Sequence, residues 1–281
     1  MSDPRSDAET LLRTGDPRGA LAKLTDAVRA KPADASLRIF LAQLLCVLGQ
    51  WERAHTQLNV VAEMDKLAIP MRETVGHAIR CELLRAQVFA GKRSPMVFGQ
   101  PDQWLALLIE SLLQSGQGEE ALSRDLAARA FDAAPTVSGR IDGQPFEWIM
   151  DADSRLGPVL EACVNGRYYW VPFSRLSKVS LEKPEDLRDC VWLPANLQFT
   201  NGGETVALVP SRYTGSHESD DGLICLARKT VWREIGPDRF AGLGQRVLAT
   251  DAGEYDLLGV RSIELDEVPS AGDGTSADET A

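Results

Sequence analysis

The sequence lacks the features that mark membrane, secreted and nucleic-acid-binding proteins. No stretch of its 281 residues approaches the roughly 18 consecutive apolar residues of a membrane-spanning helix. The amino terminus, MSDPRSDAET, is polar and has no apolar segment of the kind that directs secretion. With 30 basic against 41 acidic side chains, the formal net charge is −11, so there is no excess of cations to hold a phosphate backbone. We expect a cytoplasmic protein that binds neither membrane nor nucleic acid.

Cysteine pairs and clustered histidines are also missing. The five cysteines are odd in number and scattered in apolar runs without a CxxC pair, which is typical of buried thiols in a reducing compartment. His55, His77 and His217 lie far apart, so no zinc-site spacing is present. No serine lies in a Gly-x-Ser-x-Gly motif, and Gly242-Leu243-Gly244 lacks the third glycine of a dinucleotide loop. The sequence predicts no cofactor and no metal ion.

What is present is an internal repeat near the amino terminus. Gly15-Asp16 recurs one period later as Gly49-Gln50, and Ala20 recurs as Ala54. The glycines allow a tight turn between two antiparallel helices, and the small residues let those helices approach closely. Pro32 ends the second helix because proline cannot continue the hydrogen-bond ladder. The period, about 34 residues, is typical of tetratricopeptide (TPR) repeats.

Further helices are predicted up to Pro135. A third, degenerate hairpin is expected from Met71 to Gly91, where apolar residues recur at helical spacing. Two more helices are expected, over Trp104–Leu113 and Glu119–Ala134. We therefore predict a TPR-like α-helical domain over residues 1–135.

After Pro135 the pattern changes to short strands and turns. Two hairpins are predicted across Asn165-Gly166 and Asn201-Gly202-Gly203, because these residues tolerate positive φ. Five further strands are expected over Val179–Leu181, Val191–Leu193, Leu223–Ala227, Arg246–Thr250 and Leu257–Leu265. We predict a β-rich domain over residues 136–268 that forms a small barrel or strongly bent sheet, and a disordered acidic tail over 269–281. The fold class is therefore α+β.

An acidic cluster is the strongest candidate for catalysis. It consists of Glu147, Asp151, Asp153 and Glu161. Paired carboxylates serve as acid and base, as in a hydrolase, or hold a divalent cation. The alternative is a set of turn and cap residues, since aspartate and serine bond to nearby backbone amides. We favour the turn, because an isolated Asp-x-Asp motif is a weak signal.

An aromatic block follows the acidic cluster. Tyr168 and Trp170 are predicted to share one face of a strand, and Tyr169 to share the other with Val171. These side chains either line a peptide-binding pocket or fill the core. We favour the core.

Five blocks of the sequence are long and unusual: IFLAQLLCVLGQWERA (39–54), GQPFEWI (143–149), DADSRLGP (151–158), NGRYYWVPF (165–173) and LVPSRY (208–213). These blocks resemble the ImpE/TagJ family of type VI secretion accessory proteins. The resemblance spans about residues 8–265, and the blocks keep the family's order.

The resemblance implies a function without catalysis. Members of the family are encoded with a contractile secretion machine, and some bind the N-terminal helix of the small sheath subunit, TssB. The resemblance also implies a link to sheath assembly or recycling, with the sheath-recycling ATPase as an indirect partner. No catalytic residues come with it.

The helical part supplies the surface for such a partner. Stacked helical hairpins form a concave face that grips a peptide or helix. The candidate contacts are the polar or aromatic residues that interrupt its apolar stripe: Phe40, Gln43, Arg80 and Arg85. The leading hypothesis is an accessory protein that holds the sheath helix in this groove. The alternatives are a general TPR adaptor for another protein and, less favoured, a hydrolase using Glu147, Asp151 and Asp153.

Overall fold

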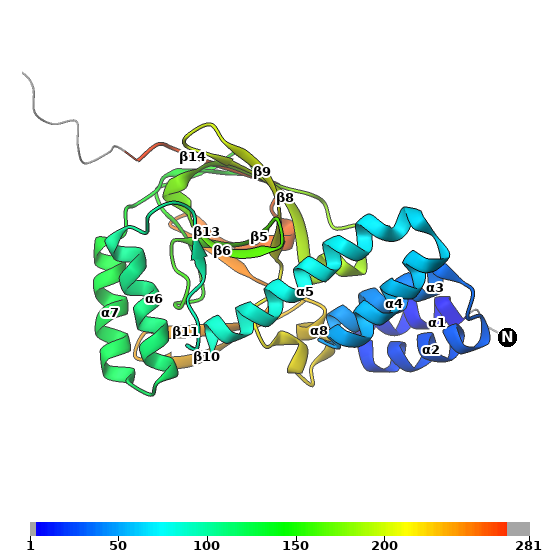
Figure 1. Cartoon of the computed structure of the whole chain (residues 1–281). Coiled ribbons are helices and arrows are strands. Elements are labelled where there is room, and N and C mark those ends of the chain that lie inside the picture. The colour runs from blue at the N-terminus through cyan, green and yellow to red at the C-terminus, as the bar shows by residue number, and fades with distance from the viewer. Residues whose placement is uncertain (1–3, 269–281) are drawn as a thin grey trace, which may run out of the picture.

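The computed structural model describes residues 4–268, and the predicted acidic tail, 269–281, lies outside them. Helical hairpins occupy one end of the molecule, and a curled sheet with a further helical hairpin occupies the other (Figure 1). This arrangement confirms an α+β fold with a TPR-like amino-terminal part and a sheet-rich carboxyl-terminal part.

Two helical hairpins form the first part, as the repeat predicts. They consist of α1 (Pro4–Arg13), α2 (Pro17–Ala30), α3 (Ala35–Val47) and α4 (Trp51–Met64). The turn glycines Gly15 and Gly49 have φ of 83° and 65°, a region that favours glycine. Asp16 and Asp34 cap the following helices by accepting a hydrogen bond from a backbone N–H in the first turn.

The prediction of a third hairpin is wrong, because a single helix, α5 (Ile69–Phe89), occupies this part of the chain. The position one period after Gly49 holds Leu83, so the sequence has no turn glycine where the first two repeats turn. The helix therefore continues past Leu83 to Phe89. The next elements are strand β1 (Met96–Val97) and helices α6 (Gln103–Gly116) and α7 (Glu120–Ala133), and both later helices confirm the prediction.

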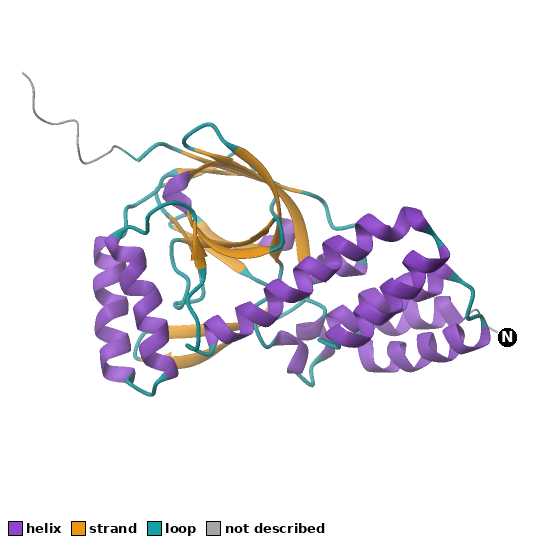
Figure 2. Ribbon diagram, in the orientation of Figure 1, coloured by secondary structure: helices purple, strands orange, loops and turns teal. Residues whose placement is uncertain are grey.

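The main sheet has nine strands among the described residues, in the order β1-β6-β5-β9-β8-β7-β14-β2-β3. Its other members are β2 (Gly139–Ile141), β3 (Gln144–Phe146), β5 (Val159–Val164), β6 (Arg167–Pro172), β7 (Leu176–Leu181), β8 (Trp192–Phe199), β9 (Glu204–Pro210) and β14 (Ser262–Leu265). Every pairing is antiparallel except β1 with β6. Figure 2 shows the sheet curled into a barrel-like shape, in agreement with the bent sheet expected.

The hairpin turns follow the sequence closely. Asn165 and Gly166 join β5 to β6 with φ of 49° and 72°, the positive values that a two-residue turn of this kind requires. The loop Asn201-Gly202-Gly203 joins β8 to β9, also as predicted. The short strand predicted over Val191–Leu193 is the beginning of the longer β8.

Two smaller sheets complete the chain. One pairs β10 (Thr230–Gly236) with β11 (Arg239–Gly244), and the other has the order β13 (Gly253–Asp256), β12 (Val247–Thr250), β4 (Ile149–Asp151). The strand predicted over Leu223–Ala227 is wrong, because this segment contains helix α8 (Gly222–Cys225). Asp221 caps that helix by accepting a hydrogen bond from the Leu223 amide. The prediction followed the apolar run and missed this capping signal.

Side chains from the sheet complete the core of the first two hairpins. Trp192 of β8 is fully buried in the same apolar cluster as the leucines of α2 and α3. Its ring lies 5.8 Å from that of Trp51 at the start of α4. The Arg212 guanidinium donates to the carbonyls of Cys46 and Val47 at 3.1 and 2.7 Å, which caps the carboxyl-terminal end of α3. The helical and sheet regions are therefore joined through shared buried contacts.

The turn glycines give a direct test of this packing. A Cβ added at Gly49 would lie 2.1 Å from the His217 ring, whereas a Cβ at Gly118, in the α6–α7 turn with φ of 85°, would meet nothing within 4 Å. We predict that Gly118→Ala lowers the free energy of unfolding by about 1 kcal/mol through backbone strain alone. Gly49→Ala should cost roughly 2–4 kcal/mol, because overpacking adds to that strain. Equal losses in chemical denaturation would contradict the contact.

Candidate functional site

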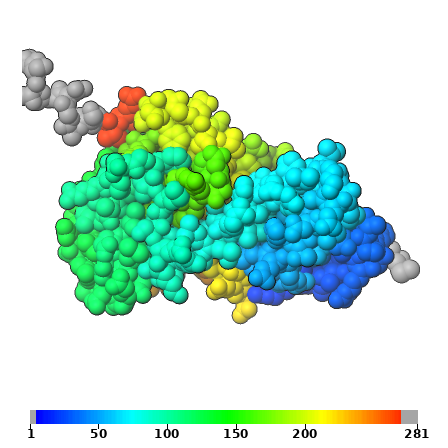
Figure 3. Space-filling model, viewed as in Figure 1, coloured from blue at the N-terminus to red at the C-terminus, as the bar shows by residue number. Residues whose placement is uncertain are grey.

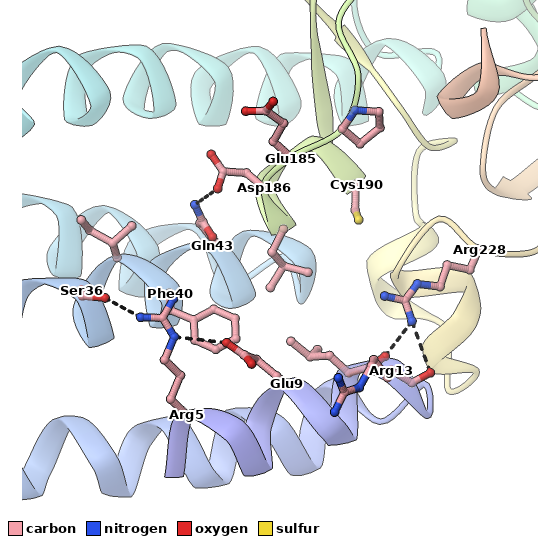
Figure 4. A pocket seen from close by; sticks show the side chains of 14 residues that line it. Arg5, Glu9, Arg13, Ser36, Phe40, Gln43, Glu185, Asp186, Cys190 and Arg228 are labelled. Atoms are coloured by element: carbon pink, nitrogen blue, oxygen red, sulfur yellow. Dashed lines mark hydrogen bonds and ion pairs between the residues drawn. The ribbon is translucent and has the colours of Figure 1, made fainter. Parts of the chain in front are cut away.

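The concave face of the first two hairpins holds a pocket of about 540 Å³ between α1, α3 and the segment 184–190 (Figure 4). The predicted contact residues Phe40 and Gln43 both line it. Its wall is mixed, with apolar side chains such as Ile39 and Leu187 beside charged ones such as Arg228.

Intramolecular contacts already engage both predicted residues in this pocket. Gln43 Nε2 donates a hydrogen bond to Asp186 Oδ1 at 2.8 Å, so the segment after β7 lies across part of the concave face. The Arg5 guanidinium lies 5.8 Å from the centre of the Phe40 ring and donates to Ser36 Oγ at 2.8 Å. A helix entering this pocket would have to displace these contacts.

Arg80 lies elsewhere, in a groove of about 740 Å³ between α4 and α5. Its side chain is exposed and forms no ion pair or hydrogen bond within the described chain. Apolar groups flank it: Ile79 and the half-exposed Leu83 on α5, and Trp51 on α4. The groove therefore combines an apolar strip with an available cation on its rim.

The prediction that Arg85 contacts a partner is wrong, because Arg85 lies in the interior and not in an open groove. Only 1% of it is exposed. Its Nε and Nη2 donate to the two carboxylate oxygens of Glu161 on β5 at 2.6 and 2.8 Å, a bidentate ion pair. Nη2 also donates to the Arg212 carbonyl at 3.0 Å. Arg85 therefore joins α5 to the sheet and is not available to a partner.

The same network contains a second buried acid of the predicted cluster, Asp151. Arg246 donates to Asp151 Oδ2 at 2.9 and 2.6 Å, and its Nη1 lies 3.3 Å from Glu161 Oε2. The Tyr213 hydroxyl donates to Asp151 at 3.0 Å, and the Tyr168 hydroxyl donates to Glu161. Each of these acids is matched by an arginine, which is how buried charge is tolerated.

Asp153 supports the turn interpretation of the acidic cluster. The Asp153 amide donates to Asp151 Oδ1 at 2.8 Å, and the Arg155 amide donates to Asp153 Oδ1 at 2.9 Å, as in the predicted turn. The Arg155 side chain pairs with the same carboxylate at 2.5 Å. Glu147, the fourth acid, is exposed beyond β3 and is not part of the network. The four acids therefore do not converge on one site.

The pKa values of the buried acids reflect this pairing. Burial by itself would raise the pKa of Glu161, but Arg85 and Arg246 lower it to about 2. Burial raises the pKa of Asp151 to about 6 despite its pairing with Arg246. Glu161 is therefore held in its charged form as part of the structure.

The aromatic block divides as the strand alternation predicts. Tyr168 and Trp170 are fully buried against α5 and α6, with the Trp170 indole donating to the Tyr168 hydroxyl at 2.8 Å. Val171, on the opposite face, lies in the core enclosed by the curled sheet, and Tyr169 packs against it. The preferred interpretation as core is confirmed for these residues.

Residues 4–268 contain neither a metal-binding cluster nor a membrane-spanning helix. No group of three or more His, Cys, Asp or Glu side chains in this part of the chain is placed to hold a metal ion. None of its helices is long and apolar enough to cross a membrane.

The fold and its grooves define a class: TPR-like hairpins fused to a curled antiparallel sheet. Residues 11–68 match the tetratricopeptide repeat family, and residues 143–264 match the ImpE protein family. The chain is 50% identical over 259 residues to the type VI secretion system accessory component TagJ of Pseudomonas aeruginosa, covering 92% of this chain and 91% of that protein. This protein therefore belongs to the ImpE/TagJ family.

A solved structure shows the same fold. The crystal structure of protein VPA1032 from Vibrio parahaemolyticus matches with a TM-score of 0.84 at 23% sequence identity. The match covers 93% of this chain and 98% of that one. The combination of hairpins and curled sheet is therefore shared along nearly the whole length.

The Arg85–Glu161 pair gives the second prediction. Glu161→Gln keeps the shape of the side chain but leaves Arg85 and Arg246 short of a buried counter-charge, so we expect a loss of about 3–5 kcal/mol in unfolding free energy. Glu264→Gln is the matched control, because Glu264 forms an exposed pair with Lys178 at 3.1 Å. That control should change stability by at most about 1 kcal/mol. Similar effects in the two variants would show that the interior pair is not a structural link.

The lowered pKa of Glu161 gives a third prediction, on pH. A carboxyl group with a depressed pKa contributes stability that is fully present above its unfolded value, 4.5, and is lost as the pH falls toward about 2. The stability difference between the native protein and Glu161→Gln should therefore be constant above pH 4.5 and shrink below it. Urea denaturation at several pH values measures this difference. A gap that stays unchanged well below the unfolded value would contradict the assigned pKa.

Proposed function

We propose that this protein is a non-catalytic accessory component of a type VI secretion system that binds the N-terminal helix of the small sheath subunit. The observation that carries the proposal is the 50% identity to the type VI accessory component TagJ along 92% of the chain. The TPR-like hairpins support it, because such repeats bind peptides and helices through their surface grooves.

The proposed mechanism is helix-in-groove recognition without chemistry. An amphipathic helix would bury its apolar face in a groove of residues 1–135, which gains roughly 25 cal/mol per Å² of apolar surface removed from water. Charges on the rim would set its orientation. The arginine partners of Asp151, Asp153 and Glu161 argue against the hydrolase alternative, because these carboxylates already serve as internal counter-charges.

The remaining expectations belong to the same proposal. We place the protein in the cytoplasm, where its free thiols at Cys46, Cys81, Cys163, Cys190 and Cys225 would stay reduced. The sheath-recycling ATPase would be reached indirectly, through the sheath subunit. The β-rich region, 136–268, would support the helical region by the buried contacts described above.

Calorimetric titration of the full chain with a synthetic peptide of the sheath subunit's N-terminal helix tests the proposal. We expect a 1:1 complex with a Kd in the micromolar range or below, and the same peptide with its apolar positions changed to serine should not bind. No heat of binding at high micromolar concentration, with the peptide shown to be helical by circular dichroism, would overturn it.

A further inference from the structure

The repeat is incomplete at its third member, and this leaves one side of α5 without a partner helix. Helices α1 and α3 each turn at a glycine into a partner helix of 14 residues, α2 and α4. Helix α5 occupies the place of the next first helix, but it runs on past Leu83 and the chain then leaves for β1. The residues that would form the third partner helix instead end α5 and form the following loop.

A comparison of burial at equivalent positions of α3 and α5 shows which side chains of α5 are uncovered. On α3, Ala42, Leu45 and Cys46 are between 0 and 1% exposed, in the core that α3 shares with its partner helix α4. The residues one period later, on α5, are Gly76, Ile79 and Arg80. All three line the α4–α5 groove, in which Gly76 and Ile79 form a buried floor and Arg80 is exposed. The residue at the position of the turn glycine, Leu83, is 50% exposed.

The groove has the two walls that a repeat offers to its next helix. One wall is α5, and the other is the first half of α4, from Trp51 to Thr56. In Figure 3 the cyan α5 region forms part of the surface turned toward the viewer. The opposite side of α5, which carries Arg85, is fixed to the sheet. The open side is therefore held in place by the pairing on the closed side.

We infer that the α4–α5 groove receives an amphipathic helix from the partner protein. This incoming helix is as long as α2 and α4 and completes the third hairpin of the repeat. The inference rests on the proposed function for the source of that helix and adds the place where it binds. The helix would lie against α5 as α2 lies against α1 and α4 against α3.

The two resident partner helices supply the pattern that the incoming helix must match. In α2 the buried positions include Ala20, Leu24 and Ala27. In α4 they include Ala54, Leu58 and Val61. In both helices a small residue is followed one turn later by leucine, and that leucine is followed one turn later by a small or β-branched residue. The incoming helix should carry the same spacing, because a small residue lets two packed helices approach closely.

Charge on the rim selects the polar face of the incoming helix. Arg80 and Arg53 are exposed at the groove, and Arg80 has no ionic partner in the described chain. Glu52 is the acidic residue among the lining side chains. A carboxylate on the incoming helix opposite Arg80 would find a free cation, so the groove favours a helix with an acidic flank.

Two substitutions of exposed side chains test the site without disturbing the fold. Leu83→Gln removes apolar surface from the groove, and Arg80→Glu reverses its charge. We expect each to weaken binding of the sheath-subunit helix peptide about tenfold or more in calorimetric titration of the full chain. Leu122→Gln on α7 is the matched control, because Leu122 is 45% exposed and distant from the groove in sequence. It should bind as the native protein does.

The outcomes separate the groove from the proposed function. Phe40→Ala probes the alternative pocket on α1 and α3. If the native protein binds and Phe40→Ala is weakened while Leu83→Gln and Arg80→Glu are not, the sheath partner stands and the α4–α5 site is overturned. If the native protein does not bind the peptide, the proposed function itself fails. Weakening only in the two groove variants supports both.

Discussion

The bidentate pair between Arg85 and Glu161 is the interaction on which the architecture depends. It joins the second half of α5 to strand β5, with Nε and Nη2 of the arginine 2.6 and 2.8 Å from the carboxylate. Both groups are removed from water, so loss of either leaves the other short of a buried counter-charge. Arg246 extends the pairing to Asp151, which binds the small β4–β12–β13 sheet into the same network. One side of α5, a helix that resembles a repeat element, is thereby fixed to the sheet.

This attachment of α5 to the sheet explains why one groove of the helical region is partly occupied and another is open. The concave face of the first two hairpins is partly occupied by the protein's own segment around Asp186, through its hydrogen bond with Gln43. The α4–α5 groove has no such internal occupant among its lining residues, because α5 passes on to the sheet and does not turn back. The sheet region thus supports the helical repeat at its unfinished end, and the surface left for a partner follows from where the chain stops repeating.

Local signals in the sequence predicted the elements but not their long-range partners. Gly15, Gly49 and Asn165-Gly166 fix turns by their own backbone preferences, so the hairpins they join could be found without a structure. Leu83 in place of a turn glycine was the signal against a third hairpin, although the helical spacing around it suggested otherwise. The arginine partners could not be found, since Arg85 and Arg246 lie 76 and 95 residues from the acids they pair with. For this reason, a prediction from the polarity of Arg85 alone places it wrongly at the surface.

Amide hydrogen exchange on the full chain, with and without the sheath-subunit helix peptide, tests the central claim most directly. The claim is that α5, fixed to the sheet on one side, presents its other side to an incoming helix. Added protection should then appear in residues 51–56 and 76–83, and not in residues 36–43 or 184–190. Protection confined to 36–43 and 184–190 would place the partner on the concave face and contradict the account.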